Sequence, residues 1–435
     1  MNSMYGNRVG IMRFKKLSIN QEVKSDPPMN SDSPAHPIVM IDGKTIDERL
    51  LVICHSYNNF QKDSIEGTSE YINKINALVR TNPFAEITNF IPISHLERFR
   101  KSKKIDLSSK PLNIDVTDTP LYYIPWNIFY KSLGEKHYEV AEKAIQRKQM
   151  QFDLVHAHFT WSAGFVGARL KEKYGVPFVV TAHGYDIYSL PFIDNEWRNK
   201  IEYVLNAADR IVTVSRSNQA CIMKLNVSTP VTVIPNGFKS GLFYPRDSSE
   251  CRKILNLPRE KKIILTVGNL EPVKGQKYLV DAFKTINSER KDAICAIVGG
   301  GRLQHALKRQ IHSLGLDDII LLAGGKPHED IPLWMNACDL FVLPSLNEGN
   351  PTVMFEALGC GKPFLGTKVG GIPEIIISND YGHLVEPADS NDLAQKILVS
   401  LNQAWDSMKI RAYAERYDWD NASREIIRVY EQIRH

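Results

Sequence analysis

Short apolar runs alternate with amphipathic stretches from residue 50 almost to the C-terminus. In the first half, the apolar runs that predict strands cover residues 50–54, 86–91, 154–156, 178–181, 210–214 and 231–234. Helices are expected at 68–80 and 163–174. After a turn-rich stretch at 235–241, a second series of strands is expected at 263–267, 293–298, 319–322, 340–343 and 364–366. Strands that alternate with helices form parallel sheets covered on both faces, so the pattern predicts an α/β fold.

Two such series predict two doubly wound, Rossmann-like domains that face each other across a cleft. A chain of 435 residues is also too long for one ordinary core. We expect a disordered extension at 1–48, an N-terminal domain at 49–236 and a C-terminal domain at 237–416. The last segment, 417–435, is expected to hold an amphipathic helix at 422–433 that packs back on the N-terminal domain, with Asp418-Trp-Asp420 before it as a cap.

Composition and charge exclude several classes of protein. The net charge of +5 is small for the chain, and no zinc-finger or RNA-binding signature is present. The six cysteines are scattered without metal-type spacing, which favours reduced thiols in a cytosolic protein. No apolar run approaches the ~20 residues that span a bilayer. Asp418-Trp-Asp420 matches an acid-x-acid metal pattern, but its position favours a helix cap, so no metal is expected.

Two glutamates eight positions apart, Glu348 and Glu356, are the most informative polar residues. Such pairs are common on solvated helix faces, but this pair follows a buried strand and spans a predicted helix start. Asn350 is a plausible N-cap and Pro351 suits the first helical position. The free amides around Gly349, Thr352 and Val353 would then form an anion site flanked by two carboxylates, as a nucleotide sugar requires. A second Gly-rich turn, which contains Gly371, follows the next strand.

Other turns at predicted strand ends offer further candidates for the donor site. Asn269 and Lys274 follow the first strand of the second series, where a lysine can neutralise a diphosphate, although a solvated turn lysine is the more ordinary explanation for this segment alone. Gly301 and Arg302 follow the next strand. The Gly-rich run there lacks the last glycine of a dinucleotide fingerprint, which has Gln304 in its place.

On the opposite wall, His183 ends a strand of the first series and is followed by a glycine. A structural histidine is the ordinary alternative. Gly67, placed before the predicted helix at 68–80, would let the backbone approach a phosphate; simple loop flexibility explains it equally well.

A basic cluster also invites a membrane interpretation. It consists of Arg98, Arg100, Lys101, Lys103 and Lys104, with apolar residues between them. A solvated loop is the default interpretation, and docking on anionic lipid is the alternative, because each basic residue contributes up to ~1 kcal/mol near such a surface. The localisation expected is therefore cytoplasmic, with contact at the inner face of the plasma membrane as an extension of that hypothesis.

From about residue 50 to the C-terminus, the chain resembles the retaining GT-B glycosyltransferases of family four (glycosyl transferases group 1). The resemblance rests on the glutamate pair, the Gly370-Gly371-Ile-Pro-Glu374 turn, the 267–275 segment, the Ile234-Pro-Asn-Gly237 turn and the 181–186 segment. These motifs identify the family and leave the substrate open. Departures from the family pattern are Asn269 where arginine is frequent and Lys239 where aspartate is frequent.

The resemblance implies a role for each motif residue. Glu348 would bind hydroxyls of the donor sugar, Glu356 the ribose hydroxyls, and Lys274 the diphosphate, with His183 beside the transferred sugar. It also implies metal-independent transfer with retention of anomeric configuration, from a nucleotide-diphosphate sugar that is a substrate rather than a cofactor. The acceptor expected is a lipid-linked or polysaccharide-precursor glycan. The alternatives are a nucleotide-sugar epimerase, a non-catalytic nucleotide-sugar-binding protein, and a phosphorylase or synthase acting on soluble sugars.

Overall fold

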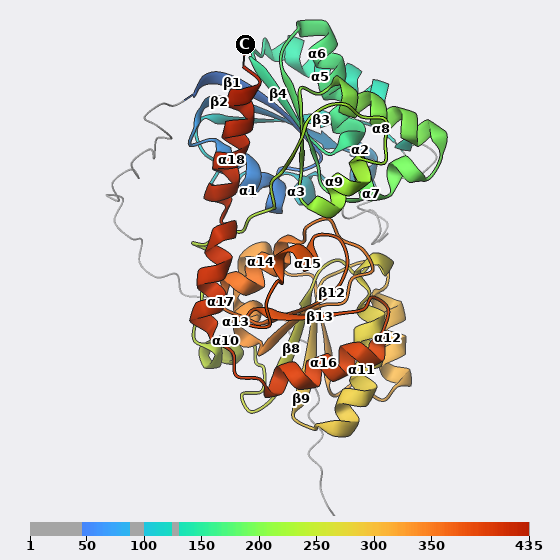
Figure 1. The fold of residues 1–435 in the computed structure, drawn as a ribbon, viewed down its shortest axis with the longest axis vertical. Coiled ribbons are helices and arrows are strands. Elements are labelled where there is room, and N and C mark those ends of the chain that lie inside the picture. Colours follow the sequence, from blue (N-terminus) through green and yellow to red (C-terminus); the bar gives the residue numbers. More distant parts are fainter. Residues whose placement is uncertain (1–45, 88–99, 124–129, 435) are drawn as a thin grey trace, which may run out of the picture.

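A computed structural model describes residues 46–87, 100–123 and 130–434. The described chain contains two parallel sheets, each with helices on both faces (Figure 1). This confirms the predicted α/β class with two doubly wound domains. In the buried strands of both sheets, successive side chains point to opposite faces and pack into different hydrophobic cores. This is the pattern of a parallel sheet that is covered on both faces.

The first sheet has seven strands in the order β3-β2-β1-β4-β5-β6-β7. Its strands are β1 (Ile46–Cys54), β2 (Ile72–Thr81), β3 (Ile114–Pro120), β4 (Leu154–His158), β5 (Phe178–Ala182), β6 (Arg210–Thr213) and β7 (Val231–Val233). Its helices are α1 (Asn59–Thr68), α2 (Pro83–Ile87), α3 (Lys101–Lys104), α5 (Leu133–Lys148), α6 (Phe165–Tyr174), α7 (Tyr185–Tyr188), α8 (Asn195–Ala207) and α9 (Arg216–Ile222). Leu51 and Ile53 of β1 pack toward α5, α6 and α8, whereas Leu50 and Val52 pack toward the other face.

The second sheet has six strands in the order β10-β9-β8-β11-β12-β13. Its strands are β8 (Lys262–Val267), β9 (Ala293–Val298), β10 (Ile320–Gly324), β11 (Leu340–Leu343), β12 (Phe364–Thr367) and β13 (Gly382–Val385). Its helices are α10 (Ser248–Ile254), α11 (Gln276–Glu289), α12 (Gln304–Ser313), α13 (Ile331–Ala337), α14 (Thr352–Gly359), α15 (Ile372–Ile375), α16 (Ser390–Asn402) and α17 (Ser407–Ala414).

The C-terminal helix α18 (Trp419–Gln432) leaves the second domain and lies along the first (Figure 1). Asp418 is its N-cap and accepts from the amide of Asp420. The helix therefore begins within the Asp418-Trp-Asp420 triplet that was expected to precede it, three residues before the predicted start at 422. Ile426 and Tyr430 of α18 are buried in the core that also contains β1 and α1. The Tyr430 hydroxyl lies 2.6 Å from Nδ1 of His156 on β4, so α18 is bonded directly to the first sheet.

Two segments of the first domain differ from the prediction. The helix expected at 68–80 is wrong, because the helix is α1 and most of that segment is strand β2. At 86–91, where a strand is expected, the described part is the end of α2, and residues 88–91 lie outside the described residues. Strands β3 and β13 were missed. β3 contains several polar residues, and β13 has only four residues and begins with glycine, so both leave little apolar pattern to detect.

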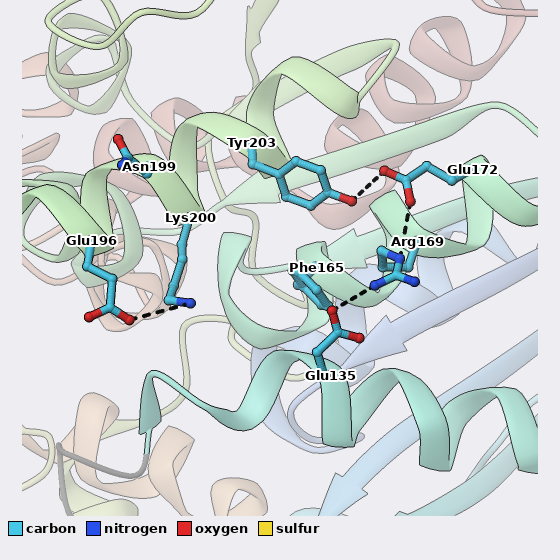
Figure 2. Close-up of a pocket in the computed structure, with 8 residues that line it drawn as sticks. All are labelled: Glu135, Phe165, Arg169, Glu172, Glu196, Asn199, Lys200 and Tyr203. Carbon is cyan, nitrogen blue, oxygen red and sulfur yellow. Dashed lines mark hydrogen bonds and ion pairs between the residues drawn. The ribbon is translucent and has the colours of Figure 1, made fainter.

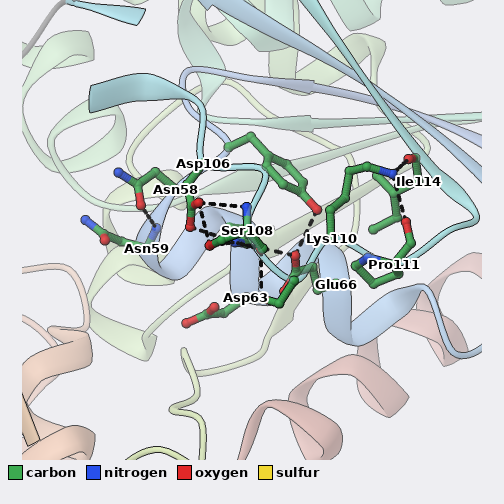
Figure 3. Close-up of polar contacts among 12 residues, drawn as sticks. Asn58, Asn59, Asp63, Glu66, Asp106, Ser108, Lys110, Pro111 and Ile114 are labelled. Atoms are coloured by element: carbon green, nitrogen blue, oxygen red, sulfur yellow. Dashed lines mark hydrogen bonds and ion pairs between the residues drawn. The ribbon is translucent and has the colours of Figure 1, made fainter. Parts of the chain in front are cut away.

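Polar contacts explain why α1 is hard to recognise as a helix. Lys62 is 4 % exposed, and its ammonium group contacts the Asp106 carboxylate at 2.7 Å and the Ser108 carbonyl oxygen at 2.5 Å. Figure 3 shows Glu66 of α1 beside the loop that carries Asp106 and Ser108. Because α1 buries charged side chains in ion pairs, its sequence lacks the apolar stripe that predicts a buried helix.

Candidate functional site

The order of the second sheet gives a switch point between β8 and β11, and we call the space at the carboxyl ends of these two strands the crevice. The chain proceeds from β8 toward β9 on one side, and β11 continues toward β12 on the other. The loops that follow such neighbouring strands diverge and leave a binding site at their carboxyl ends. Here the two loops also contact each other: Leu346 donates to the Val273 carbonyl at 2.7 Å. Gly275 has a φ of +65°, and a β-carbon there would lie 1.9 Å from the Pro344 carbonyl oxygen.

An ion pair joins the two loops at this crevice. The Lys274 ammonium nitrogen lies 2.6 Å from Oε1 of Glu348, and the Ser345 hydroxyl donates to the same oxygen at 2.7 Å. Glu348 is only 7 % exposed, whereas a quarter of the Lys274 side chain is accessible. The carboxylate is therefore held in one orientation, while the ammonium group reaches the surface of the crevice.

Helix α14 begins directly after this loop and directs its first amides toward the crevice. The amides of the first turn have no acceptor within the helix, and with the helix dipole they favour an anion. The loop is pressed against the next turn, since Gly371 donates to the Gly349 carbonyl at 2.8 Å. A β-carbon at Gly370 would lie 1.8 Å from the Glu348 carbonyl oxygen, and the φ of +52° there also favours glycine.

The first domain contacts the same loop directly, and Figure 1 shows α7 and α9 facing α14 and α15 across the domain boundary. A β-carbon at Gly349 would lie 2.0 Å from the His183 carbonyl oxygen. Asn236 bonds twice to Asn350, through its amide at 3.0 Å and its side chain at 2.7 Å. The crevice of the second sheet is thus closed on one side by the end of β5.

The His183 imidazole is neutral in this environment. Its Nε2 lies 3.0 Å from Nδ1 of His158, and its Nδ1 is buried without a hydrogen-bond partner among the described residues. Burial, followed by the neighbouring His158, lowers the pKa of His183 well below its usual value. Asp186 orients the turn by accepting from the amides of His183 and Gly184 at 3.1 and 2.8 Å.

Glu356 lies deeper in α14 and has a partner of its own. Its Oε1 is 2.8 Å from Nε2 of His328, and the glutamate is 5 % exposed. Burial opposes protonation of His328, but the hydrogen bond and charge of Glu356 outweigh it and raise the pKa of the imidazole. Glu356 is therefore oriented by a hydrogen bond to His328.

A separate hollow of 470 Å³ lies in the first domain, between α5, α6 and α8 (Figure 2). Its charged groups pair with one another: Arg169 with Glu135 at 2.7 Å and Glu172 at 3.1 Å, and Lys200 with Glu196 at 3.5 Å. Because every residue lining it belongs to the first domain, it is not part of the crevice at α14.

Comparison with known proteins matches both halves of this architecture. The model of glycosyl transferases group 1 matches residues 247–417, and that of glycosyltransferase family 4 matches residues 108–240. The two matched segments together cover more than half of the chain, and the first contains the Lys274, Glu348 and Glu356 crevice. The chain belongs to the group 1 glycosyltransferases.

Relatives and solved structures agree with this assignment. This glycosyltransferase is 29% identical over 302 residues to an uncharacterized glycosyltransferase of Methanocaldococcus jannaschii, covering 68% of this chain and 79% of that one. A D-inositol 3-phosphate glycosyltransferase of Thermobispora bispora is 28% identical over 303 residues, with 64% and 70% covered.

Among solved structures, sucrose-phosphate synthase from Thermosynechococcus elongatus has a TM-score of 0.71 at 22% identity, covering 88% of this chain and 99% of that one. Anabaena HepE, solved with UDP-glucose, has a TM-score of 0.69 at 22% identity, with 89% and 100% covered. These structures show the GT-B fold.

The glycosyltransferase brings most of the predicted donor residues to one place. Lys274, Glu348, Gly349 and Asn350 line or support the crevice, and Gly371 packs against it. The start of α14 differs from the prediction by one residue. Pro351 occupies the N-cap position and Thr352 is the first helical residue, followed by Val353. Asn350 is not the cap, because its side chain bonds to Asn236 instead.

Four predicted residues lie in other surroundings. Gly67 is not before a helix but within the last turn of α1, against Ser423 of α18. Arg302 is mostly exposed and pairs with Glu271 at 2.6 Å, while the backbone of Gly301 packs on Leu270. Asn269 is exposed at the end of β8. The donor roles of these residues stay predictions.

Sequence reasoning missed the partners that hold the site. Ser345 and Asn236 lie in motif segments but carry no predicted role, and His328 carries no motif. The contacts of His328 and Asn236 form only when separate loops meet, whereas Ser345 bonds to Glu348 within one loop. Glu374 was noted only as part of a turn; its carboxylate accepts from the amides of Arg216 and Ser217 at 2.8 Å and so caps α9 of the other domain.

Proposed function

We propose that this glycosyltransferase moves a sugar from a nucleotide-diphosphate sugar to a lipid-linked or polysaccharide-precursor glycan, with retention of anomeric configuration. The observation that carries the proposal is the crevice between β8 and β11, where the Lys274 ammonium group, the Glu348 carboxylate and the first amides of α14 converge. A related fold, Anabaena HepE, was solved with UDP-glucose, which supports a nucleotide sugar as the donor class.

In this proposal the diphosphate lies at the start of α14. The acceptor hydroxyl oxygen bonds to the anomeric carbon while the bond from that carbon to the diphosphate oxygen breaks and its electron pair leaves with the diphosphate. The proton of the acceptor hydroxyl passes to that departing oxygen. Lys274 and the α14 amides stabilise the charge that develops on the leaving group, which is where preorganised donors contribute most to rate.

The two carboxylates have separate roles in this proposal. Glu348, oriented by Ser345 and Lys274, accepts hydrogen bonds from hydroxyls of the donor sugar. Glu356, held by His328, accepts from the ribose hydroxyls. His183 lies beside the sugar in this proposal. Because burial lowers the pKa of its imidazole, the ring carries no charge that would repel the positive charge developing at the anomeric carbon.

The test is a panel of nucleotide sugars, measured by calorimetry and by release of nucleoside diphosphate. We expect Lys274→Ala and Glu356→Ala to weaken nucleotide binding by about tenfold or more, since each removes a charged contact. Glu348→Gln should keep nucleotide affinity and lose transfer. Lys368→Ala is the matched control, because Lys368 forms an ion pair at 2.6 Å with Glu386 on the surface of the same domain.

Wild-type nucleotide affinity in both alanine variants would contradict the proposed donor site. Epimerisation of the donor sugar without an acceptor would replace the proposal by the isomerase alternative.

We also propose that no metal ion is needed, because Lys274 and the α14 amides supply the positive charge. Transfer should therefore persist in excess EDTA, and loss of transfer in EDTA would contradict this point.

We further propose peripheral contact with an anionic membrane through the basic cluster. Among the described residues of the cluster, Lys101 and Lys103 are exposed, and Lys101 is paired with Asp118 at 2.9 Å; Arg98 lies outside the described residues. Leu107 and Leu112 are exposed at 56 % and 97 % in the segment that follows. No helix in the described part of the chain has the length and apolarity to cross a membrane.

Flotation with vesicles tests the membrane contact. The protein should float with anionic vesicles and not with neutral ones, because the basic cluster is attracted by lipid charge. Low salt is needed because this attraction is screened beyond about 10 Å at 0.1 M salt. The double variant Lys101→Ala/Lys103→Ala should float less, and the Lys277→Ala variant, whose lysine lies in the other domain, should not change. Absence of flotation at low salt would overturn the contact.

A further inference from the structure

The first sheet has a switch point of its own, between β1 and β4, that the donor site does not use. The chain proceeds from β1 toward β2 on one side, and β4 continues toward β5 on the other. His55 follows β1 and Phe159 follows β4, and their rings stack with centroids 4.8 Å apart. Such a position binds ligands in open α/β sheets, so the side chains gathered there are candidates for acceptor contacts.

Arg80, near the end of β2, is a buried cation at this place. It is 7 % exposed, and its guanidinium donates to the Ser162 hydroxyl at 2.8 Å. The rings of Tyr123 and Tyr130 lie 5.6 and 5.9 Å away. Among the described residues no carboxylate lies within ion-pair distance of it. A buried charge without a counter-ion is unfavourable, so this arrangement suits a protein that receives its anion from a ligand.

Each of two imidazoles beside Arg80 has one ring nitrogen without a hydrogen-bond partner among the described residues. The Nε2 atoms of His55 and His137 are buried without a hydrogen-bond partner among the described residues. His137 is fully buried, and its Nδ1 lies 2.9 Å from the same Ser162 hydroxyl that Arg80 contacts. Burial, and then the charge of Arg80, lowers the pKa of His137 to about 3 and that of His55 well below its usual value. Both rings are neutral and each can donate one N–H.

The cluster is connected to the donor crevice by ring contacts, one stacked and one tilted. Phe159, which stacks on His55, lies 4.6 Å from the His183 ring, and the His183 backbone meets Gly349. A ligand group held at Arg80 would therefore extend along the first domain toward the point where the sugar is transferred. We propose that the acceptor carries an oxyanion, a phosphate ester or a carboxylate, and that Arg80 binds it with His55 and His137. This inference rests on the proposed function and specifies its acceptor.

The experiment titrates inorganic phosphate into protein saturated with the nucleoside diphosphate that binds best, so that the donor site is already filled. At constant ionic strength, wild type should bind phosphate, Arg80→Gln should bind it about tenfold more weakly or not at all, and Arg80→Lys should be intermediate. Arg210→Gln is the control, because Arg210 begins β6 at the opposite end of the same sheet and should leave phosphate affinity unchanged. Glycerol, a neutral hydroxyl compound, should give no heat at the same concentrations.

Two further arms identify the source of the anion. Vesicles of phosphatidylcholine with phosphatidic acid should displace phosphate if the group belongs to a lipid; glycerol 3-phosphate alone should displace it if the ester is soluble. Equal phosphate affinity in wild type and Arg80→Gln, or no phosphate binding by wild type, would overturn the subsite. Nucleotide binding is measured in the same samples. If wild type does not bind any nucleoside diphosphate, the proposed function is wrong. If it binds the nucleotide but Arg80→Gln has the phosphate affinity of wild type, only the subsite is wrong.

Discussion

Each glutamate of the donor crevice depends on one cationic partner. Glu348 is held by Lys274 and Glu356 by His328. Lys274 could be predicted as a site residue because it follows a strand and precedes a glycine. His328 could not, because it lies in a polar turn after β10 without a motif, and only the packing of that turn against α14 brings the imidazole to the carboxylate.

The pair at Glu356 predicts a pH effect. A histidine whose pKa is raised on folding stabilises the fold below its unfolded value, near 6.5, and this stabilisation is lost as pH rises through the raised pKa. His328→Gln keeps a donor but not the charge. We expect it to cost about 1 kcal/mol of unfolding free energy at pH 6, a value reduced because 26 % of the imidazole is exposed, and little at pH 9.

Urea unfolding of wild type and His328→Gln between pH 5.5 and 9 measures the difference in unfolding free energy between them. The contributions of other titrating groups cancel in this difference because both proteins contain those groups. A difference that does not change over this range would contradict a charged histidine at this position. Nucleotide affinity should follow the same trend, since His328 orients the carboxylate proposed to bind ribose.

At the scale of elements, the packing of α1 on α18 accounts for Gly67. A β-carbon there would lie 2.3 Å from the hydroxyl oxygen of Ser423, which is fully buried and has no partner among the described residues. The sequence offered a phosphate contact or loop flexibility for this glycine and gave no sign of the packing. The helix was expected after Gly67 instead of around it, and the contact joins residues more than 350 positions apart.

A double variant separates packing from phosphate binding. Gly67→Ala alone should destabilise the protein by about 1–3 kcal/mol through overpacking. Gly67→Ala/Ser423→Ala should be at least as stable as wild type, because it removes the clash and the unpaired hydroxyl, and alanine favours the helix by about 0.5–1 kcal/mol over glycine. Thermal unfolding measures the stability, and nucleotide affinity should stay unchanged in both. Weaker nucleotide binding by the stable double variant would favour the original donor role instead.

The strands of the second domain were largely predictable, whereas those of the first were less so. β8, β9 and β11 are continuous apolar runs, because both faces of each are buried. β2 begins with Ile72-Asn73-Lys74-Ile75, whose apolar spacing also fits a helix, and only pairing with β1 and β3 decides between the two. Register and pairing depend on the rest of the sheet and are not encoded in a short window.

At the scale of the whole molecule, we expect the thermal stability of the two domains to respond differently to acid. In the first domain, burial lowers the pKa of five histidines: His55, His137, His156, His158 and His183. A histidine whose pKa is lowered on folding leaves stability intact above its unfolded value, near 6.5, and loses it as pH falls, because the unfolded chain binds the proton first. Each contributes up to about 1.4 kcal/mol per pH unit below that value.

Calorimetry at pH 7.5, 6.0 and 5.0 should therefore show the first domain melting at progressively lower temperature. The second domain should change less over this range, since its His328 has a raised pKa. A parallel decline of both domains would show that the buried histidines do not control acid stability. Replacing His156, which bonds to Tyr430 and Thr181, is unsuitable as a control because its loss would remove packing as well.

The contact of Gly349 with His183 predicts an effect on transfer. In Gly349→Ala the new β-carbon meets a backbone oxygen that cannot rotate away, so the domains must separate locally. We expect transfer to fall by about tenfold or more while nucleotide binding changes little, because productive geometry tolerates displacements of less than about 1 Å. Gly241→Ala is the control, since a β-carbon there meets no atom within 4 Å. Unchanged transfer in Gly349→Ala would show that this approach is not needed for catalysis.

The polypeptide passes between the domains twice, and the two passages lie side by side. Phe238 donates to the Tyr417 carbonyl at 3.1 Å, and Trp419 donates to the Phe238 carbonyl at 3.1 Å, so both crossings are joined by a short parallel bridge. We expect two bonded segments at one edge to act as a hinge, which favours swinging of the lobes over sliding. Closure about that hinge would bring Gly349 back against His183 in the same orientation each time.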